Sequence, residues 1–331
     1  MQINNSGYQS SPKSSTDIES IIVVCAADNN YSMPLAVTMR SAIENLKDNC
    51  KIIFYIIDGG ITNLNKQKIL KSLILGRCEV KFVSMPDYLL RDIQEAHKTL
   101  ESANKRIKSH ITIASFYRLI ISELLPNNVE KVIYLDCDLV VKGDLGQLWQ
   151  SDIENSYMLA TQDTWIQYVS NPYGLLNYQE LGIPSDLKYF NAGVLLINLK
   201  KWRTDNISAK AITYLKQNRE YIRWHDQDVL NALLYGQWGE LGPRWNLSAT
   251  IFGGYWKECP FTEEVYNAVI MEPNIIHFTT EKKPWTSRHT LCKEYFYYYL
   301  DMTAWSGWRL TVWRRLWLRL KPLILKYAPK I

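Results

Sequence analysis

The sequence predicts an α/β fold built around a mainly parallel sheet. Three short apolar runs, at 21–27, 51–58 and 79–85, are predicted strands, and helical patterns at about 33–47 and 63–75 separate them. Strands that alternate with helices in this way are typical of βαβ units. A chain of 331 residues has room for one large domain with a tail, or for two modest domains.

The same reading continues along the rest of the chain. The predicted elements are a helix at about 110–125, strands at 132–135, 157–163 and 190–198, helices at 200–219 and 226–235, and a short strand at 275–278. Pro172, Gly174, Gly182 and Pro184 punctuate a long connection that we expect to cover a site. Neither a repeat nor a linker interrupts the chain before about residue 300. We therefore expect a disordered segment at 1–18, one domain at 19–300 and a tail at 301–331.

The apolar strand at 132–135 ends in two carboxylates, Asp136 and Asp138. Alternate residues of an extended chain share a face, so both carboxylates are expected to point to the same side. Oxygen ligands at that point suit a hard divalent cation that keeps positions open for a diphosphate. The carboxyl ends of strands are also where α/β sheets bind their ligands. An isolated Asp-x-Asp is weak by itself, because many copies are solvated turns.

Composition limits the cellular setting. The six cysteines are scattered without a Cys-x-x-Cys pair, which predicts buried small hydrophobes rather than a zinc site. The lack of a secretory leader favours a reducing cytoplasm. No stretch reaches the roughly 18 consecutive apolar residues that a membrane-spanning helix requires. Twelve Trp and 21 Tyr suit sugar-stacking surfaces or membrane interfaces, although most are expected in the core and its rim.

Five segments in order resemble the family-8 retaining glycosyltransferases, most closely the bacterial lipooligosaccharide α-galactosyltransferase type. They are 26–31 (AADNNY), 135–138 (LDCD), 190–202 (FNAGVLLINLKKW), 226–228 (DQD) and 277–285 (HFTTEKKPW). The resemblance covers about 21–285, some four-fifths of the chain, and its motifs are specific in combination. It implies a GT-A fold, which is a Rossmann-like nucleotide-binding mixed sheet flanked by helices. It also implies that the enzyme uses a UDP-sugar and Mn²⁺, with Mg²⁺ as a possible substitute.

The resemblance also assigns ligands. His277 matches the family's third protein ligand, so the expected metal ligands are Asp136, Asp138 and His277. A neutral imidazole is a competent Mn²⁺ ligand. The implied donor-binding residues are Ala26, Asp28, Tyr31, Arg118, Asp136, Cys137, Asp138, Asn191, Ala192, Thr280 and Lys283. Among them, Asp28 matches a residue that accepts the uracil N–H, and Tyr31 one that stacks on the base.

Catalytic roles follow from the same comparison. Lys283 matches a cation that clamps the diphosphate leaving group, although the position three residues before it is Thr280, where the family usually has Gly. Asp163 and Asp226 resemble carboxylates that hold sugar hydroxyls. Gln227 stands where a double-displacement nucleophile is expected, and an amide is a poor nucleophile.

Other matches concern the sugars. Arg118 matches an Arg that bridges donor sugar and phosphate, and Asn191 matches a donor-sugar contact. The small Ala192 and Gly193 leave room for that sugar. His110 and Trp224 match positions that meet the acceptor, although packing in the core or rim explains them nearly as well.

The tail differs from the body. Residues 305–331 contain seven Lys or Arg and no acid, so the rest of the chain sums to −2 against a net charge of +5. Trp305, Trp308, Trp313 and Trp317 recur at roughly helical spacing, which predicts either an interfacial helix on an anionic membrane or a helix packed on the core.

The preferred interpretation is a UDP-sugar-dependent retaining hexosyltransferase that carries galactose or glucose to a glycan or glycolipid acceptor. We expect it in lipopolysaccharide or cell-surface glycan synthesis, peripheral on the cytoplasmic face of the membrane. A nucleotide-sugar nucleotidyltransferase is an alternative, but residues 26–31 lack the glycine-rich basic loop it would need. A non-enzymatic membrane-binding module is a second alternative. The near-neutral charge of the chain before the tail disfavours a nucleic-acid partner.

Overall fold

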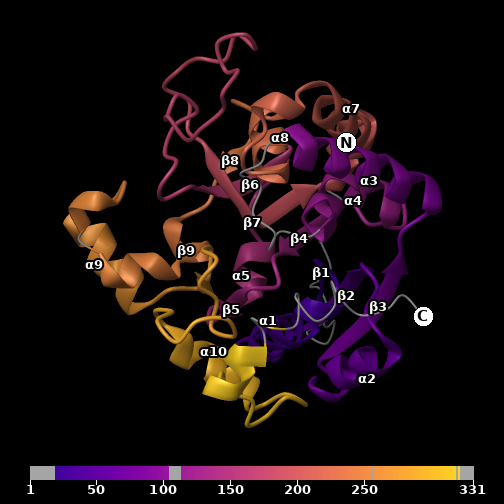
Figure 1. Ribbon diagram of the computed structural model, residues 1–331, viewed down its shortest axis with the longest axis vertical. Coiled ribbons are helices and arrows are strands. Elements are labelled where there is room, and N and C mark those ends of the chain that lie inside the picture. Colours follow the sequence, from indigo (N-terminus) through magenta and orange to yellow (C-terminus); the bar gives the residue numbers. More distant parts are fainter. Residues whose placement is uncertain (1–18, 104–112, 255, 318–319, 321–331) are drawn as a thin grey trace, which may run out of the picture.

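The computed structural model describes residues 19–103, 113–254, 256–317 and 320 (Figure 1). The first half forms three strands with intervening helices, in which β1 pairs in parallel with β2, and β2 with β3. The elements are β1 (Glu19–Ala27), α1 (Ser32–Glu44), β2 (Cys50–Asp58), α2 (Asn63–Lys71), β3 (Cys78–Ser84) and α3 (Asp87–Ala103). The βαβ prediction is confirmed here, because central strands buried on both faces carry continuous apolar runs.

The second half completes a seven-stranded mixed sheet in the order β3-β2-β1-β4-β7-β6-β8. β4 is parallel to β1, whereas β7 runs antiparallel to both β4 and β6. The added strands are β4 (Lys131–Leu135), β6 (Met158–Gln162), β7 (Phe190–Asn198) and β8 (Gly239–Glu240). The predicted mixed sheet flanked by helices is confirmed.

Two layers of helices cover the sheet (Figure 1). On one side lie α3 and four later helices, α4 (Ile121–Leu124), α6 (Leu199–Thr204), α7 (Ile207–Gln217) and α8 (Asp226–Leu233). On the other side α1 and α2 pack their apolar residues against the alternate faces of β1, β2 and β4. The two apolar clusters fix the sheet, so the strand ends hold their positions at its edge.

A second, three-stranded sheet stands at the carboxyl end of β4. It contains β5 (Leu139–Val141), β10 (Ile275–His277) and β9 (Leu247–Ser248), with β10 in the centre. His277 pairs with Leu139 on one side and with Ser248 on the other. This small sheet brings residues from the last third of the chain next to the Asp-x-Asp segment.

Several predicted elements differ from the structure. The single helix expected at 200–219 is two helices, because Asn206 adopts a left-handed conformation with φ 53° between them. The helix expected at 110–125 is a 3₁₀ helix at Ile113–Ile120 followed by α4, while 110–112 lie outside the described residues. Four helices were not predicted: α3, α5 (Leu145–Trp149), α9 (Glu263–Met271) and α10 (Lys293–Leu300).

The described part of the tail divides in two. Trp305 and Trp308 are half-buried and pack against apolar residues that include Phe296 of α10. A helical turn at 312–317 then leaves its side chains exposed, with Trp313 81% exposed. The prediction of one continuous amphipathic helix from 305 is therefore wrong for 305–311. Among the described helices, none has both the length and the apolar character needed to cross a membrane.

Candidate functional site

Asp136 and Asp138 stand on a turn between β4 and β5. The backbone amide of Asp136 donates to the carbonyl of Gly193 (2.9 Å), which extends the pairing of β4 with β7 by one residue. The hydroxyl of Thr38 in α1 lies 3.0 and 2.9 Å from the carbonyls of Cys137 and Leu139. A buried side chain from the first helix thus holds the turn, which fixes the direction of both carboxylates.

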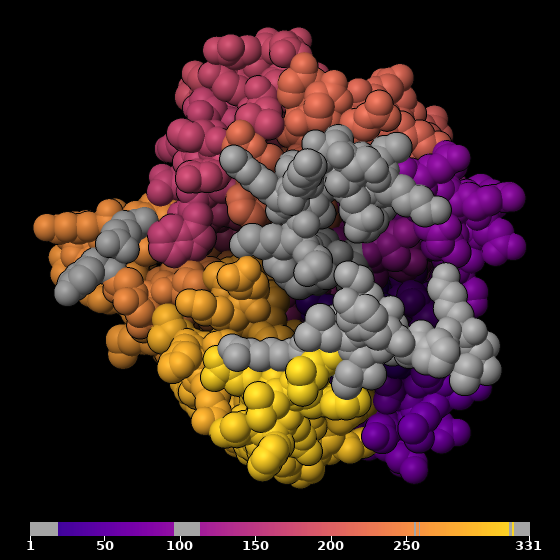
Figure 2. All heavy atoms as spheres, in the orientation of Figure 1, coloured from indigo at the N-terminus to yellow at the C-terminus, as the bar shows by residue number. Residues whose placement is uncertain are grey.

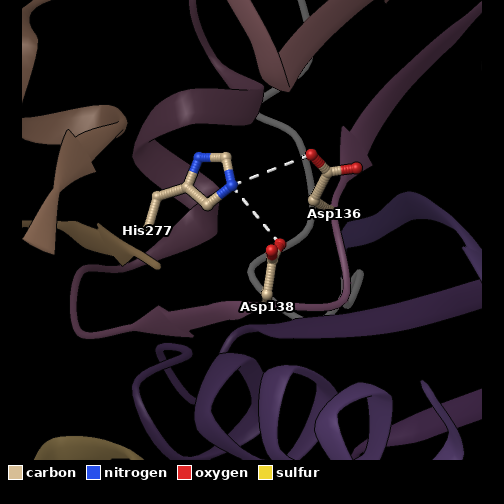
Figure 3. Close-up of side chains that lie close together, drawn as sticks. All are labelled: Asp136, Asp138 and His277. Carbon is tan, nitrogen blue, oxygen red and sulfur yellow. Dashed lines mark ion pairs between the residues drawn. The ribbon is translucent and has the colours of Figure 1, made fainter. Parts of the chain in front are cut away.

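His277 completes a group of three possible metal ligands (Figure 3). Its Nε2 atom lies 3.3 Å from Oδ1 of Asp138 and 3.8 Å from Oδ2 of Asp136. One ligand atom from each residue falls within 4.8 Å of the others. The predicted set therefore converges, and two carboxylates with one imidazole suit a divalent ion such as Mn²⁺.

The other ring nitrogen of His277 has its own partner. Nδ1 lies 2.9 Å from Oδ1 of Asn246, and Nδ2 of Asn246 donates to Oδ1 of Asn191 (2.9 Å). Since that oxygen of Asn246 can only accept, Nδ1 carries a proton, and Nε2 is the ring nitrogen that faces the two carboxylates. Outer contacts of this kind orient metal-binding histidines. Asn246 was missed, because its role depends on pairing between β9 and β10 that no local pattern reveals.

Gly193 is required by the same cluster. A Cβ atom at this position would lie 2.3 Å from Cε1 of His277 and 2.9 Å from Oδ2 of Asp136. The space beside Gly193, which we expected to receive the donor sugar, is therefore occupied by two of the three metal-ligand candidates.

Lys283 is 7% exposed and reaches Asp138. Its Nζ atom lies 2.5 Å from Oδ2 of Asp138 and also donates to the carbonyl of Phe278. Burial by itself would raise the pKa of Asp138, but Lys283 and His277 outweigh it and hold that pKa well below its usual range. Asp138 thus stays ionised, as a metal ligand must be, and the cation of Lys283 stands beside the cluster.

Arg118 connects Asp136 with Asp226. Its NH2 atom lies 2.6 Å from Oδ1 of Asp136, and its Nε lies 2.7 Å from Oδ2 of Asp226. It also donates to the carbonyl of Ala192. Burial raises the pKa of Asp226 to about 7, although the charge of Arg118 acts in the opposite direction. Arg118 therefore orients two carboxylates, and its expected contact with the donor stays a prediction.

Gln227, Asn191 and Asp163 form a connected polar group. Oε1 of Gln227 accepts from the amide of Ala192 (3.0 Å), while its Nε2 donates to Oδ2 of Asp163 (3.3 Å). The same Oδ2 accepts from Nδ2 of Asn191 (3.0 Å). Through Asn246, these contacts connect the expected sugar-binding carboxylate Asp163 to His277.

The expected nucleotide-binding residues lie along one side of the site. Asp28 caps the 3₁₀ helix Asn29–Tyr31 by accepting from the amides of Asn30 (2.8 Å) and Tyr31 (3.1 Å). The ring of Tyr31 meets that of Trp285 edge to face, with centroids 5.9 Å apart. Cys137 donates to the carbonyl of Ala26 (3.1 Å), so the two motifs are adjacent.

Thr280 stands in the loop that ends at Lys283. Its hydroxyl accepts from the amide of Lys282 (3.3 Å), and its backbone lies outside the left-handed region. A side chain thus organises this loop, which does not depend on glycine at this position.

The two predicted acceptor residues have different outcomes. Trp224 precedes α8 and lines the cavity, whereas His110 lies outside the described residues.

The expected site residues other than His110, together with the part of the connection between 163 and 173, line a cavity of about 1700 Å³. It extends from Asp28 and Tyr31, past the metal-ligand candidates, to Tyr173 and Trp224. Pro172 of the predicted covering connection is part of its wall, so that expectation is confirmed. Figure 2 shows the pink atoms of this connection beside the orange atoms of later segments.

A mixed α/β sheet with three possible metal ligands at the carboxyl end of β4, inside a large cavity, is typical of an enzyme whose ligand binds at the end of the strands. Comparisons with known proteins make the class specific. The family described as glycosyl transferase family 8 matches residues 22–289, and the chain belongs to this family.

Three relatives illustrate the relationship. General stress protein A of Bacillus subtilis is 32% identical over 292 residues, which cover 86% of this chain and 94% of that protein. A lipopolysaccharide 1,2-glucosyltransferase of Escherichia coli is 27% identical over 81% of this chain and 74% of its own length. The crystal structure of galactosyltransferase LgtC with donor and acceptor sugar analogues matches with a TM-score of 0.71 and 28% identity, covering 86% of this chain and 96% of that one.

The predicted membership of family 8, including its likeness to the lipooligosaccharide type, is confirmed. The chain is an enzyme, a glycosyltransferase with a GT-A-like fold. Neither the nucleotidyltransferase nor the non-enzymatic alternative agrees with this family.

Proposed function

We propose that this protein is a retaining hexosyltransferase that moves galactose or glucose from a UDP-sugar to a glycan or glycolipid acceptor. The observation that carries the proposal is the convergence of Asp136, Asp138 and the Nε2 face of His277 beside Lys283. In a family-8 chain, this arrangement matches the demands of a diphosphate leaving group, which needs concentrated positive charge.

The residues present fit a divalent metal. Asp138 is held ionised, and Asn246 accepts from Nδ1 of His277, which leaves Nε2 as the ring nitrogen directed at a metal. A mixed carboxylate and imidazole set favours Mn²⁺, with Mg²⁺ as a possible substitute. When bound, the ion would offset negative charge on the diphosphate.

The protein's own groups would act on the donor as follows. Asp28 and Tyr31 would hold the uracil, with Ala26 and Cys137 shaping that pocket. Lys283 would donate to the phosphate oxygen that receives the electron pair when the bond to the sugar breaks. Arg118, Asn191, Ala192 and Thr280 would position the sugar and phosphates, and Asp163 and Asp226 would hold sugar hydroxyls.

Retention requires attack on the face that the UDP leaves. Gln227 is a poor nucleophile, and both ends of its amide are hydrogen-bonded to Ala192 and Asp163. We therefore favour a mechanism in which UDP departs and leaves the sugar as an oxocarbenium-like species. The acceptor oxygen then attacks the sugar on the same face. The acceptor proton would pass to the departing phosphate. Anomeric NMR of the product checks this, since an inverted linkage contradicts it.

We place the enzyme in lipopolysaccharide or cell-surface glycan synthesis, peripheral on the cytoplasmic face of the membrane. The exposed Trp313 and Trp317 beside Arg314 and Arg315 support contact with a membrane surface. Trp together with Arg on one short segment suits the headgroup region of an anionic bilayer.

The central experiment is a donor-hydrolysis screen. Full-length protein is incubated with UDP-galactose, UDP-glucose and other UDP-sugars, with and without Mn²⁺, and released UDP is measured. We expect Mn²⁺-dependent release that Asp138→Asn abolishes, while the exposed Asp152→Asn serves as a matched control with wild-type release. Unchanged turnover and Mn²⁺ affinity in Asp138→Asn would refute the proposal.

A further inference from the structure

The turn that carries Asp28 and Tyr31 has little structure of its own. It is a single 3₁₀ turn, Asn29–Tyr31, in which Oδ1 of Asp28 accepts from the amides of Asn30 and Tyr31. Oδ2 of Asp28 has no hydrogen-bond partner among the described residues, and Asp28 lines the cavity, so Oδ2 is the oxygen left for a ligand. The hydrogen bonds of a 3₁₀ turn have poorer geometry than those of an α-helix. The direction of Oδ2 must therefore be set from outside the turn.

Asn29 connects this turn to the start of α2. Its Oδ1 atom accepts from the amide of Thr62 (3.0 Å), from the hydroxyl of Thr62 (3.0 Å) and from Nδ2 of Asn65 (2.8 Å). Thr62 is the N-cap residue of α2, and Ile69 anchors that helix in the core. Asn29 thus fastens the turn to a helix that the core holds in place. Because Asn29, Thr62 and Asn65 are not among the residues that line the cavity, these bonds act from behind the site.

The loop that follows β2 lies against the same turn. The amide of Gly59 donates to the carbonyl of Ala27 (2.9 Å). A Cβ atom at Gly59 would lie 3.0 Å from that carbonyl oxygen and 3.4 Å from Cα of Asp28, and glycine permits this close approach of two backbones. The backbone of Asp28 is therefore packed against the segment that leads to Thr62, and Asn29 supplies the side-chain bonds between the two.

We propose that Asn29 is a positioning residue that gives the site its preference for uracil over cytosine. A carboxylate can only accept hydrogen bonds. The N3 atom of uracil carries a hydrogen, whereas N3 of cytosine presents a lone pair that a carboxylate would repel. Discrimination by Asp28 requires that Oδ2 be held at that atom, and Asn29 fixes the turn that bears Asp28. This inference rests on the proposed use of a UDP-sugar and names a residue that acts through Asp28 rather than on the donor itself.

Binding of three ligands separates an effect on the base from a general loss of affinity. Full-length protein with Mn²⁺ is titrated calorimetrically with UDP, CDP and inorganic pyrophosphate. We expect the wild type to prefer UDP to CDP. Asn29→Ala should raise the Kd of UDP about fivefold, the equivalent of one net hydrogen bond, and should narrow the preference over CDP. Its Kd for pyrophosphate, which has no base, should stay at the wild-type value.

Matched variants complete the test. Asn29→Asp keeps an oxygen that can accept from Thr62 and Asn65, and it should restore most of the UDP affinity. Asn65→Ala removes one of the donors and should weaken UDP binding less than Asn29→Ala does. Asn63→Ala is the control, because this exposed residue lies in the first turn of α2 and its side chain takes no part in these bonds.

Three results would overturn the inference. The first is equal affinity of the wild type for UDP and CDP. The second is an unchanged Kd of UDP together with an unchanged preference over CDP in Asn29→Ala. The third is an equal loss of affinity for UDP and pyrophosphate in that variant, which would indicate a general disturbance of the fold. Absence of UDP binding by the wild type would instead refute the proposed function, so the two failures are distinguishable.

Discussion

The Nδ1 atom of His277 and the Oδ1 atom of Asn246 lie 2.9 Å apart, and this contact determines which ring nitrogen faces Asp136 and Asp138. Replacing Asn246 with Ala removes the acceptor, so the ring can rotate or change tautomer. We expect Mn²⁺ affinity to fall about 10- to 100-fold, the usual cost of losing such an outer contact. Calorimetric titration with Mn²⁺ checks this.

The matched control for Asn246→Ala is the exposed Asn128→Ala, which precedes β4 at the opposite edge of the sheet and should retain wild-type affinity. Equal Mn²⁺ affinities for the two variants would show that Asn246 does not orient the imidazole.

A methyl group at Gly193 should disrupt the metal-ligand cluster. Gly193→Ala places a Cβ atom within 3 Å of both His277 and Asp136, so one of them must move. We expect Mn²⁺ binding and donor hydrolysis to fall at least tenfold, with a destabilisation of about 1–3 kcal/mol from overpacking. Gly242→Ala is the control, because no atom lies within 4 Å of a Cβ atom there. Wild-type Mn²⁺ binding in Gly193→Ala would contradict the crowded geometry.

Buried Asp228 should make stability depend on pH. Burial raises its pKa to about 6, although the amides of Arg223 and Trp224 and the hydroxyl of Tyr189 all donate to it. An unfolded Asp has a pKa near 4, so the folded protein binds the extra proton between about pH 4 and pH 6. The free energy of unfolding therefore falls as pH rises through this window, by roughly 2–3 kcal/mol.

Urea denaturation of wild type and Asp228→Asn at several pH values isolates this contribution. The difference between the two curves should change across the window and level off above about pH 6. Parallel curves would mean that the Asp228 carboxyl keeps an ordinary pKa. Asp152→Asn, which changes an exposed carboxyl, should run parallel to the wild type.

The exposed turn of the tail should bind anionic vesicles. A combined Trp313→Ala and Trp317→Ala variant removes two exposed rings but keeps the neighbouring arginines. We expect sedimentation with phosphatidylglycerol-containing vesicles to drop severalfold, because interfacial binding scales with the apolar area inserted. Met271→Ala, which alters another exposed apolar side chain, is the control. If the double variant sediments as the wild type does, the membrane proposal for this segment fails.

Sequence reasoning was most successful where chemistry and local pattern coincide. The strand before Asp136 and Asp138 is a continuous apolar run, and its end carries both carboxylates, so the position of the site follows from the residues alone. The pairing of His277 with that turn came only from the family resemblance. The contact depends on a three-stranded sheet of which only the strand at 275–278 was predicted, because β5 and β9 are three and two residues long, too short for periodicity to reveal.

Other differences have local causes. The break at Asn206 depends on a left-handed residue, a conformation that Asn tolerates but does not require. The tail was predicted as one helix because its tryptophans have helical spacing. Trp305 and Trp308 instead pack on the core around Phe296, a tertiary contact that overrides the local pattern.

The position of β10 late in the chain has a consequence for synthesis of the protein. A polypeptide that stops before residue 275 carries both aspartates but lacks the imidazole and the lysine that follows it. Such a fragment would have an incomplete ligand set, and metal affinity depends on the complete set. Under the proposed function, nascent or prematurely terminated chains would therefore not cleave the activated sugar, because the full ligand set arrives only with about the final sixth of translation.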